Sequence, residues 1–390
     1  MDPTAEPPPR RARPGRLVGR VLGIPLYLNA SMIVLAVLVT VVYGGFVQST
    51  LELPAPVSYV IGFGFVVCLL GSVLLHELGH ALTARRFGIG VRGITIELLG
   101  GYTEMDREAP GPRVDALVAL AGPAVSLVLG GLAAAAAWVL PNDTITGQIA
   151  FQLAASNILV ALFNALPGLP LDGGRALRAL IWALVRDRNR ATLVAGWAGR
   201  LIAVVTAVTV LALYHVGTLS LFGVVFVLLV VFTLWQGAGQ SIRMARMTSR
   251  FPLVDLGRLA RPVFRVPSGT PLSEAERRGA AQGDQRTDPA LGVEDSSGRL
   301  VGLVDTTAAA RVPAERRPWV AVDTVARDVG RITALKADLT GEQVVRAVQA
   351  YPGAQYLVVS GEDVVGVLDV ADLAAVLEPR KTVAPAKERS

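Results

Sequence analysis

Six long apolar segments constrain this chain more than any other feature of its sequence. A helix needs about 20 predominantly apolar residues to cross the hydrocarbon core of a bilayer, and each segment reaches that length. Of the 390 residues, 52% are hydrophobic and only 17% are charged, which is too apolar for an ordinary soluble protein. We expect membrane-spanning helices at residues 24–47, 57–84, 114–140, 148–167, 193–215 and 218–238.

The basic residues gather on one side of this expected bundle. Arginines are abundant in the N-terminal arm, at residues 85–113 and 173–192 and after the last span, whereas residues 48–56, 141–147 and 216–217 contain no Lys or Arg. This positive-inside bias predicts a multi-pass protein of the cell membrane with both termini in the cytoplasm. The net charge of +6 does not indicate nucleic-acid binding, because the arginines lie beside apolar spans and form no stripe with interleaved aromatics. A single cysteine excludes an internal disulfide framework.

His76, Glu77 and His80 form an H-E-x-x-H pattern near the end of the second apolar segment. Side chains four residues apart project from one face of a helix, so both imidazoles can bind one ion. Zinc suits two neutral imidazoles, and a third protein ligand with one open position is typical of a catalytic site. Glu77 would then take a proton from the attacking water. A structural His pair satisfied by hydrogen bonds is the alternative, but burying these groups unpaired near membrane depth is costly.

The segment NALPGLPLDGGRAL contains the best candidate for a third ligand, Asp172. Pro167 and Pro170 would break the fourth span and turn the backbone, so that a carboxylate can point inward. The alternative is that Asp172 caps a helix that begins near residues 174–177. The spacing alone does not decide between these two roles.

Together, H-E-L-G-H in one span and N-x-x-P-x-x-P-L-D-G-G some 90 residues later resemble the site-2 protease family of intramembrane zinc metalloproteases. A glycine-rich, strand-like segment between the second and third spans and AGPAVS in the third also fit, and the resemblance covers residues 1 to about 240. It implies one zinc ion per chain, with His76, His80 and Asp172 as its ligands and Glu77 as the general base. It also places Asn164 near the site, where its amide could donate to an oxyanion; an interhelical hydrogen bond is the alternative.

The resemblance implies hydrolysis of peptide bonds in or near the transmembrane segments of single-span membrane proteins, for example anti-sigma factors, in regulated intramembrane proteolysis. Two rival functions remain: a carrier whose ligands form a translocation site, and a regulatory membrane protein with a non-proteolytic zinc site. Inverted repeats with paired broken helices would favour a carrier, but only one proline-broken span is evident.

The segment VRGITIELLGGYTEM has the pattern of a β-strand between two spans. Ile94, Ile96 and Leu98 alternate with polar residues, and Gly100–Gly101 ends the run. We expect this strand to pair with an unwound substrate by β-augmentation. A membrane-associated hairpin with no role in substrate binding is the alternative.

After Arg250 the sequence becomes typical of a soluble α/β protein, and it repeats. GRLVGLVDTTAAARV (298–312) and EDVVGVLDVADLAAVL (362–377) are similar, and each follows a helix-like segment about 30 residues upstream. They look like a tandem pair of cystathionine-β-synthase (CBS) domains. By that resemblance Asp372 would contact the ribose of an adenine nucleotide, but Ala308 replaces the acidic residue in the first copy. Dimerisation or gating without a ligand is therefore the favoured role.

We therefore predict a multi-pass α-helical membrane protein with six transmembrane helices, a small membrane-associated β segment and a cytosolic α/β CBS pair. The expected partners are the lipid bilayer, a single-span protein substrate and a second copy of the chain. The expected parts are a disordered basic arm, a protease domain, two CBS modules and a disordered tail, at residues 1–22, 23–240, 251–314, 315–378 and 379–390.

Overall fold

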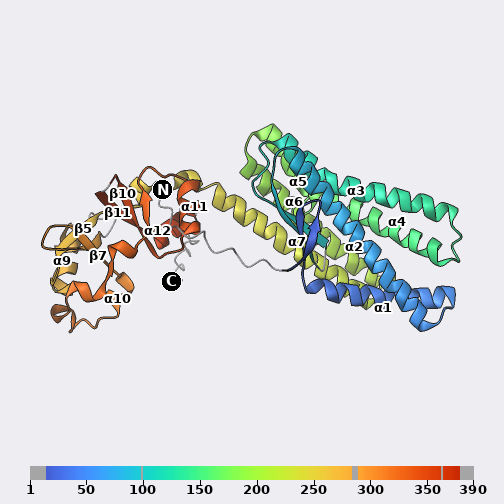
Figure 1. Ribbon diagram of the computed structural model, residues 1–390, viewed down its shortest axis with the longest axis horizontal. Coiled ribbons are helices and arrows are strands. Elements are labelled where there is room, and N and C mark those ends of the chain that lie inside the picture. The colour runs from blue at the N-terminus through green and yellow to red at the C-terminus, as the bar shows by residue number, and fades with distance from the viewer. Residues whose placement is uncertain (1–14, 98–99, 283–288, 362, 378–390) are drawn as a thin grey trace, which may run out of the picture. The chain divides into compact units, whose positions relative to one another are not determined.

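The chain forms two compact units, of which the first ends at Arg246 and the second begins at Met247 (Figure 1). The first consists of long helices and one small sheet, and the second alternates short strands with short helices. The computed structural model describes residues 15–97, 100–282, 289–361 and 363–377.

Over the described part of the chain, six helices are long and apolar enough to cross a membrane. The expected fold class of the first unit, a multi-pass helical domain with a small β segment, is therefore confirmed. The longest helix has 32 residues and spans about 48 Å, so part of it extends beyond a hydrocarbon core of about 30 Å. The six helices are α1 (Ser31–Leu51), α2 (Ala55–Arg86), α3 (Pro112–Val139), α4 (Ile145–Asn164), α6 (Arg188–His215) and α7 (Leu221–Thr248).

The first span begins later than its apolar sequence predicts. Residues 24–28 form strand β2 (Ile24–Leu28), and residues 16–21, expected in a disordered arm, form strand β1 (Arg16–Val21). Leu22 and Gly23 join the two strands in a tight turn with φ angles of 51° and 77°. Both expectations were wrong because a short apolar run does not distinguish a buried strand from a helix, and the partner of β2 lies some 70 residues away. The remainder of the predicted arm, residues 1–14, and the predicted tail lie outside the described residues.

A four-stranded sheet packs against the C-terminal part of α2. Its order is β1-β2-β3-β4, with β3 (Val91–Glu97) parallel to β2 and antiparallel to β4 (Gly100–Met105). The predicted strand is confirmed as β3. Gly100–Gly101 were expected only to end this strand, but they begin the second strand, β4. Leu98 lies outside the described residues. Ile94 and Ile96 bury their side chains among residues of α2. Strand β4 is the last strand of the sheet and also contacts this helix, so it forms the sheet edge beside α2.

The connection at residues 173–192, expected to be a loop, contains a helix that does not span the membrane. This helix, α5 (Asp172–Val185), has 14 residues and is amphipathic: Gly173, Gly174 and Ala179 are buried, whereas Leu180 and Leu184 are exposed. α4 ends at Asn164, and a compact turn containing two prolines leads from there into α5. This turn places the first residue of α5 inside the helical bundle.

The second unit contains two copies of one β-α-β-β-α arrangement, which confirms the internal repeat. In each copy the first strand is parallel to the second, and the second is antiparallel to the third. The first copy is β5 (Val263–Pro267), α9 (Leu272–Gln282), β6 (Ala290–Glu294), β7 (Leu300–Val304) and α10 (Thr306–Ala310). The second is β9 (Ala334–Lys336), α11 (Glu342–Ala350), β10 (Gln355–Ser360), β11 (Asp363–Asp369) and α12 (Val370–Leu377).

The two copies exchange short segments, so the expected boundaries at residues 251 and 315 do not separate two structural modules. Val254 and Leu256 precede the first copy but are buried in the core of the second, beside Tyr356. Conversely, β8 (Ala326–Asp328) pairs with β7 and completes the sheet of the first copy. The exchange has a hydrophobic cause: both segments contribute apolar side chains to a core that lies far away along the chain.

Candidate metal centre

Two histidines project from the C-terminal part of α2 toward one point. His76 and His80 are one helical turn apart and are buried, with exposed fractions of 5% and 4%. Their Nε2 atoms lie 3.2 Å apart. The helical geometry predicted from the H-E-x-x-H spacing is therefore present.

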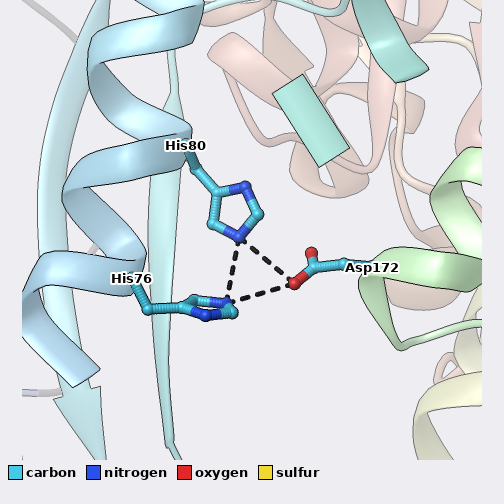
Figure 2. A group of neighbouring side chains, drawn as sticks. All are labelled: His76, His80 and Asp172. Atoms are coloured by element: carbon cyan, nitrogen blue, oxygen red, sulfur yellow. Dashed lines mark hydrogen bonds and ion pairs between the residues drawn. The ribbon is translucent and has the colours of Figure 1, made fainter. Parts of the chain in front are cut away.

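Asp172 reaches the same point from α5. Its Oδ2 atom lies 3.2 Å from Nε2 of His76 and 3.2 Å from Nε2 of His80 (Figure 2). Asp172 is the first residue of α5, and the preceding Leu171 occupies the N-cap position without a side-chain capping bond. The capping role considered for Asp172 is therefore wrong, and its carboxylate instead faces the two imidazoles.

The second nitrogen of each imidazole is held by α3. Nδ1 of His80 donates to the carbonyl oxygen of Val118 at 2.7 Å, and Nδ1 of His76 lies 2.9 Å from the hydroxyl oxygen of Ser126. A carbonyl oxygen can only accept, so Nδ1 of His80 carries the proton and the neutral ring presents a lone pair at Nε2. The Nε2 atoms of two imidazoles and a carboxylate oxygen thus converge, which suits a divalent cation such as zinc.

Gly122 of α3 provides the space in which these atoms meet. A Cβ atom at this position would overlap Nε2 of His80 and lie 2.6 Å from Nε2 of His76. Gly122 and Ser126 belong to the AGPAVS segment, which was noted from the sequence only as part of the family resemblance, with no role for either residue at the metal centre. The signal that could have revealed their role is the AGPAVS segment, which places both residues on the α3 face that meets the histidines.

The loop that carries Asp172 is held by close backbone contacts. A Cβ atom on Gly199 of α6 would overlap the carbonyl oxygen of Leu169, and one on Gly237 of α7 would lie 2.7 Å from Cγ of Pro170. Glycine at both positions lets two spanning helices approach the loop closely. These contacts fix the direction from which the Asp172 carboxylate enters the centre.

A buried ion pair also joins α5 to α3. Nε and Nη2 of Arg178 donate to the carboxylate of Asp115 at 3.0 Å and 2.7 Å, and the Asp115 side chain is 2% exposed. Arg175 approaches the same carboxylate at 3.6 Å. A carboxylate at the start of an apolar span needs a cationic partner, so Asp115 was itself a signal that the sequence analysis did not use.

Glu77 lies next to the centre, against the edge strand of the sheet. Its Oε2 atom accepts a hydrogen bond of 2.7 Å from the hydroxyl of Thr103, and the residue is only 5% exposed. A Cβ atom on Gly101 would lie 2.9 Å from Cγ of Glu77, so only glycine allows β4 to approach this closely. The sequence did not predict that Thr103 and Gly101 would contact the candidate base.

These residues open into a cavity of about 1050 Å³ within the helical unit. His76, Glu77, His80 and Asp172 share its wall with Asn164, so the structure brings these five predicted site residues together. Residues of β4 also line it, and its remaining wall is formed largely by apolar side chains from α1, α2, α4 and α7. The cavity can therefore accept an extended, mainly apolar peptide next to the converging ligand atoms.

Asp372, the sixth predicted site residue, lies in the second unit and has a different environment. Nε and Nη2 of Arg261 donate to its two carboxylate oxygens at 2.7 Å and 2.8 Å. The carboxylate that the resemblance assigns to ribose binding is therefore engaged by a side chain of the same unit. Ala308, its counterpart in the first copy, offers no carboxylate.

Comparison with known proteins gives four results. The sequence profile of Peptidase family M50 matches residues 64–154 and 143–206. A protein of Synechocystis sp. that carries a zinc metalloprotease name is 31% identical over 375 residues, which cover 93% of this chain and 95% of that protein. Among solved structures, a site-2 protease from Methanocaldococcus jannaschii is similar with 24% identity and a TM-score of 0.42, covering 58% of this chain and 95% of that chain. A CBS-domain-containing protein from Agrobacterium tumefaciens is similar with 18% identity and a TM-score of 0.24, covering 31% of this chain and 88% of that chain.

The similarity to the Synechocystis protein extends over nearly the whole chain, so it includes the helices of the metal centre and the C-terminal repeat. The family profile covers the H-E-x-x-H segment and the loop that carries Asp172. The donor atoms assembled there are those that zinc prefers. The chain therefore belongs to peptidase family M50 and is a zinc metalloendopeptidase of the site-2 protease type.

Proposed function

We propose that this enzyme cleaves single-span membrane proteins in or near their transmembrane segments, as in the regulated intramembrane proteolysis of anti-sigma factors. The observation that carries the proposal is the position of the ligand cluster. His76, His80 and Asp172 converge within a cavity that is walled by residues of the spanning helices. A substrate segment can therefore reach the centre from within the bilayer region.

His76, His80 and Asp172 would hold the zinc ion, which supplies a Lewis acid for the scissile carbonyl and lowers the pKa of water. Glu77 is the general base: it takes a proton from the attacking water and delivers it to the leaving amine. The hydroxyl of Thr103 donates to Oε2 of Glu77 at 2.7 Å, so it holds this carboxylate in place and leaves its other oxygen available for the proton.

Asn164 is proposed as a donor to the oxyanion that develops on the scissile carbonyl. Its support is that it lines the cavity together with the ligand cluster and ends α4 at the beginning of the loop that carries Asp172. Asn157 lines the same cavity, but its amide donates to Ser72 and to the Leu153 carbonyl oxygen. Asn164 is therefore the better candidate of the two asparagines.

Strand β4 is proposed to hold the substrate in an extended form. A helical substrate hides its amides in internal hydrogen bonds, so it must unwind before a peptide bond is accessible. Within the described strands β4 pairs only with β3, and Gly100, Gly101, Tyr102 and Thr103 line the cavity beside Glu77. An unwound substrate can add to this edge by β-augmentation, with its backbone next to the catalytic carboxylate.

We further propose that the enzyme resides in the cell membrane with both termini in the cytoplasm. The support is the distribution of arginines, which occur at the C-terminal end of α2 and in the connection between α4 and α6, but not in the connections at the opposite ends of these helices. The metal centre lies in the half of α2 that ends with Arg85 and Arg86, so it would face the cytoplasmic side.

For the CBS pair we propose dimerisation or regulation. Adenine-nucleotide binding at Asp372 is a weaker proposal, because a ribose would have to displace the two hydrogen bonds that Arg261 donates to this carboxylate. Titration of the full-length chain with ATP, followed by hydrogen exchange of α12, tests it directly.

The central test compares Glu77→Gln with the wild-type chain in liposomes that contain a single-span substrate. Cleavage should fall by about 10²–10⁴-fold, the usual contribution of a general base, while zinc content stays the same. Glu52→Gln, at an exposed position after α1, is the matched control and should cleave normally. Full cleavage by Glu77→Gln would remove this residue from the mechanism. Zinc flux across sealed vesicles without any cleavage would indicate a transporter.

A further inference from the structure

Arg200 of α6 lies between two tryptophan rings within a membrane-spanning helix. Its guanidinium carbon is 4.9 Å from the centre of the Trp197 ring and 4.7 Å from the centre of the Trp235 ring on α7. Nε of Arg200 is buried without a hydrogen-bond partner, and no carboxylate pairs with this guanidinium among the described residues. An arginine in such a segment is costly and marks a candidate functional site.

The two rings hold the cation on the outer surface of the bundle. Trp197 is 52% exposed and Trp235 is 42% exposed, so both face the surroundings of the helices. Cation–π contacts orient the guanidinium but do not neutralise its charge. The planar donors of an arginine match the oxygen atoms of a phosphate group well. An external anion is therefore the missing partner.

The surface around Arg200 and its two tryptophan rings changes from basic to apolar along the helices. Toward the basic end, Arg243 is one turn beyond Gly239, whose position faces the Arg200 guanidinium, and Arg243 is exposed with no ion pair in the described part of the chain. In the opposite direction, Val204 and Phe232 are 48% and 58% exposed. A phosphate beside cations and an acyl chain beside apolar side chains is the arrangement of a phospholipid at a bilayer interface.

We propose that Trp197, Arg200 and Trp235 bind the phosphate group of an anionic phospholipid, with Arg243 as a second cation for its headgroup. The exposed apolar surface argues for a lipid and against free phosphate, because free phosphate has no acyl chain to contact Val204 or Phe232. The site lies on the two helices whose Gly199 and Gly237 hold the loop that carries Asp172. A bound lipid therefore stabilises the α6–α7 pair that positions this carboxylate.

The test measures lipid retention by the purified full-length chain, using native mass spectrometry after exposure to equal amounts of phosphatidylglycerol and phosphatidylcholine. The wild-type chain should retain phosphatidylglycerol preferentially, and Arg200→Gln should reduce this retention about tenfold, as expected for the loss of one charge-assisted hydrogen bond. Arg86→Gln removes an exposed arginine from the end of α2 and serves as the control for net charge; its retention should be unchanged.

Arg200→Lys separates a folding defect from a binding defect, because it keeps the charge but loses the planar donors. It should retain an intermediate amount of phosphatidylglycerol, while zinc content remains at the wild-type level in both Arg200 variants. Equal retention by Arg200→Gln and wild type would overturn the proposal, as would complete displacement of the lipid by inorganic phosphate. Lipid retention is independent of cleavage, so this result stands apart from the test of Glu77.

Discussion

Asp172 and Asp372 are the same residue type in similar local settings, yet their carboxylates have different partners. Each lies in the first turn of a short helix, and the resemblances to known families place each of them at a ligand site. Asp172 faces two imidazoles, and its Oδ2 is 3.2 Å from the Nε2 atom of each. Asp372 faces Arg261, which donates two hydrogen bonds to it. The comparison teaches that the partner supplied by a distant segment, and not the local motif, decides whether a carboxylate is free to hold a cation.

The largest expected effect comes from replacing Asp172, the carboxylate that is free to hold a cation. Asp172→Asn replaces an anionic ligand atom by a neutral amide, so zinc content should fall below about one-tenth of the wild-type amount and cleavage should fall by about 10²-fold or more. Atomic absorption of the purified chain and the liposome cleavage assay measure both. Asp372→Asn is the matched control, and normal zinc content in Asp172→Asn would mean that the two carboxylates do not differ as we conclude.

Gly122→Ala tests the space in which Asp172 meets the histidines. The new methyl group would overlap Nε2 of His80, so we expect zinc affinity to fall by about 10–100-fold, as it does when groups that orient metal ligands are disturbed. Gly131→Ala on the same helix is the control, because a Cβ atom there meets nothing within 4 Å. Competition with a chelator measures the affinity. Similar values for the two variants would show that α3 does not confine the ligand atoms.

Local patterns predicted part of this centre and missed the rest for a physical reason. His76, Glu77 and His80 lie on one helix, so their spacing was sufficient. Asp172 required the resemblance to a family, because a loop and two other helices determine its direction. The AGPAVS segment was the only local signal for Gly122, and no local signal indicated Thr103, because its contact depends on how β4 packs against α2.

The same limitation explains the errors in the fold. The six spans were predictable because length and apolarity alone identify them. Strand β2 was not, because it pairs with β3, which follows two spanning helices later, and β1 was missed with it because β1 pairs with β2. Arg200 was hidden within a long apolar run, where its two aromatic partners could be recognised only after α6 and α7 were placed side by side.

A smaller effect is expected from the two arginine–aspartate pairs, which differ in burial. Asp115 is 2% exposed, whereas the side chains of Arg261 and Asp372 are 29% and 31% exposed. Asp115→Asn should lower the free energy of unfolding by about 3–5 kcal/mol, because it leaves the charge of Arg178 buried and unpaired. Asp372→Asn should lower it by no more than about 1 kcal/mol.

Chemical unfolding in detergent micelles measures both changes, and double-mutant cycles with Arg178→Gln and Arg261→Gln isolate the pairwise contributions. The buried pair should show the larger coupling. Equal coupling in the two pairs would contradict the conclusion that burial distinguishes them.

The smallest effect concerns Asp323 in the second unit, a third carboxylate whose partners are neutral. The backbone N–H of Gly269 donates to it at 2.7 Å and the hydroxyl of Ser268 at 2.8 Å, and these hydrogen bonds lower the pKa of Asp323 below its usual value. Because the pKa is lower in the folded state, Asp323 contributes stability above its unfolded pKa of about 4, and this contribution is lost as the pH falls through the folded pKa.

Asp323→Asn should therefore weaken the second unit at pH 6, and its effect should shrink as the pH falls below about 4 and through the lower folded pKa, where the wild-type carboxylate also takes up a proton. Hydrogen exchange of strands β5, β6 and β7 in the full-length chain measures the local free energy of opening at each pH. Asp328→Asn is a control, since this exposed carboxylate accepts one backbone hydrogen bond, from Gly330. A difference between Asp323→Asn and wild type that does not change with pH would show that the lost hydrogen bonds act through geometry and not through charge.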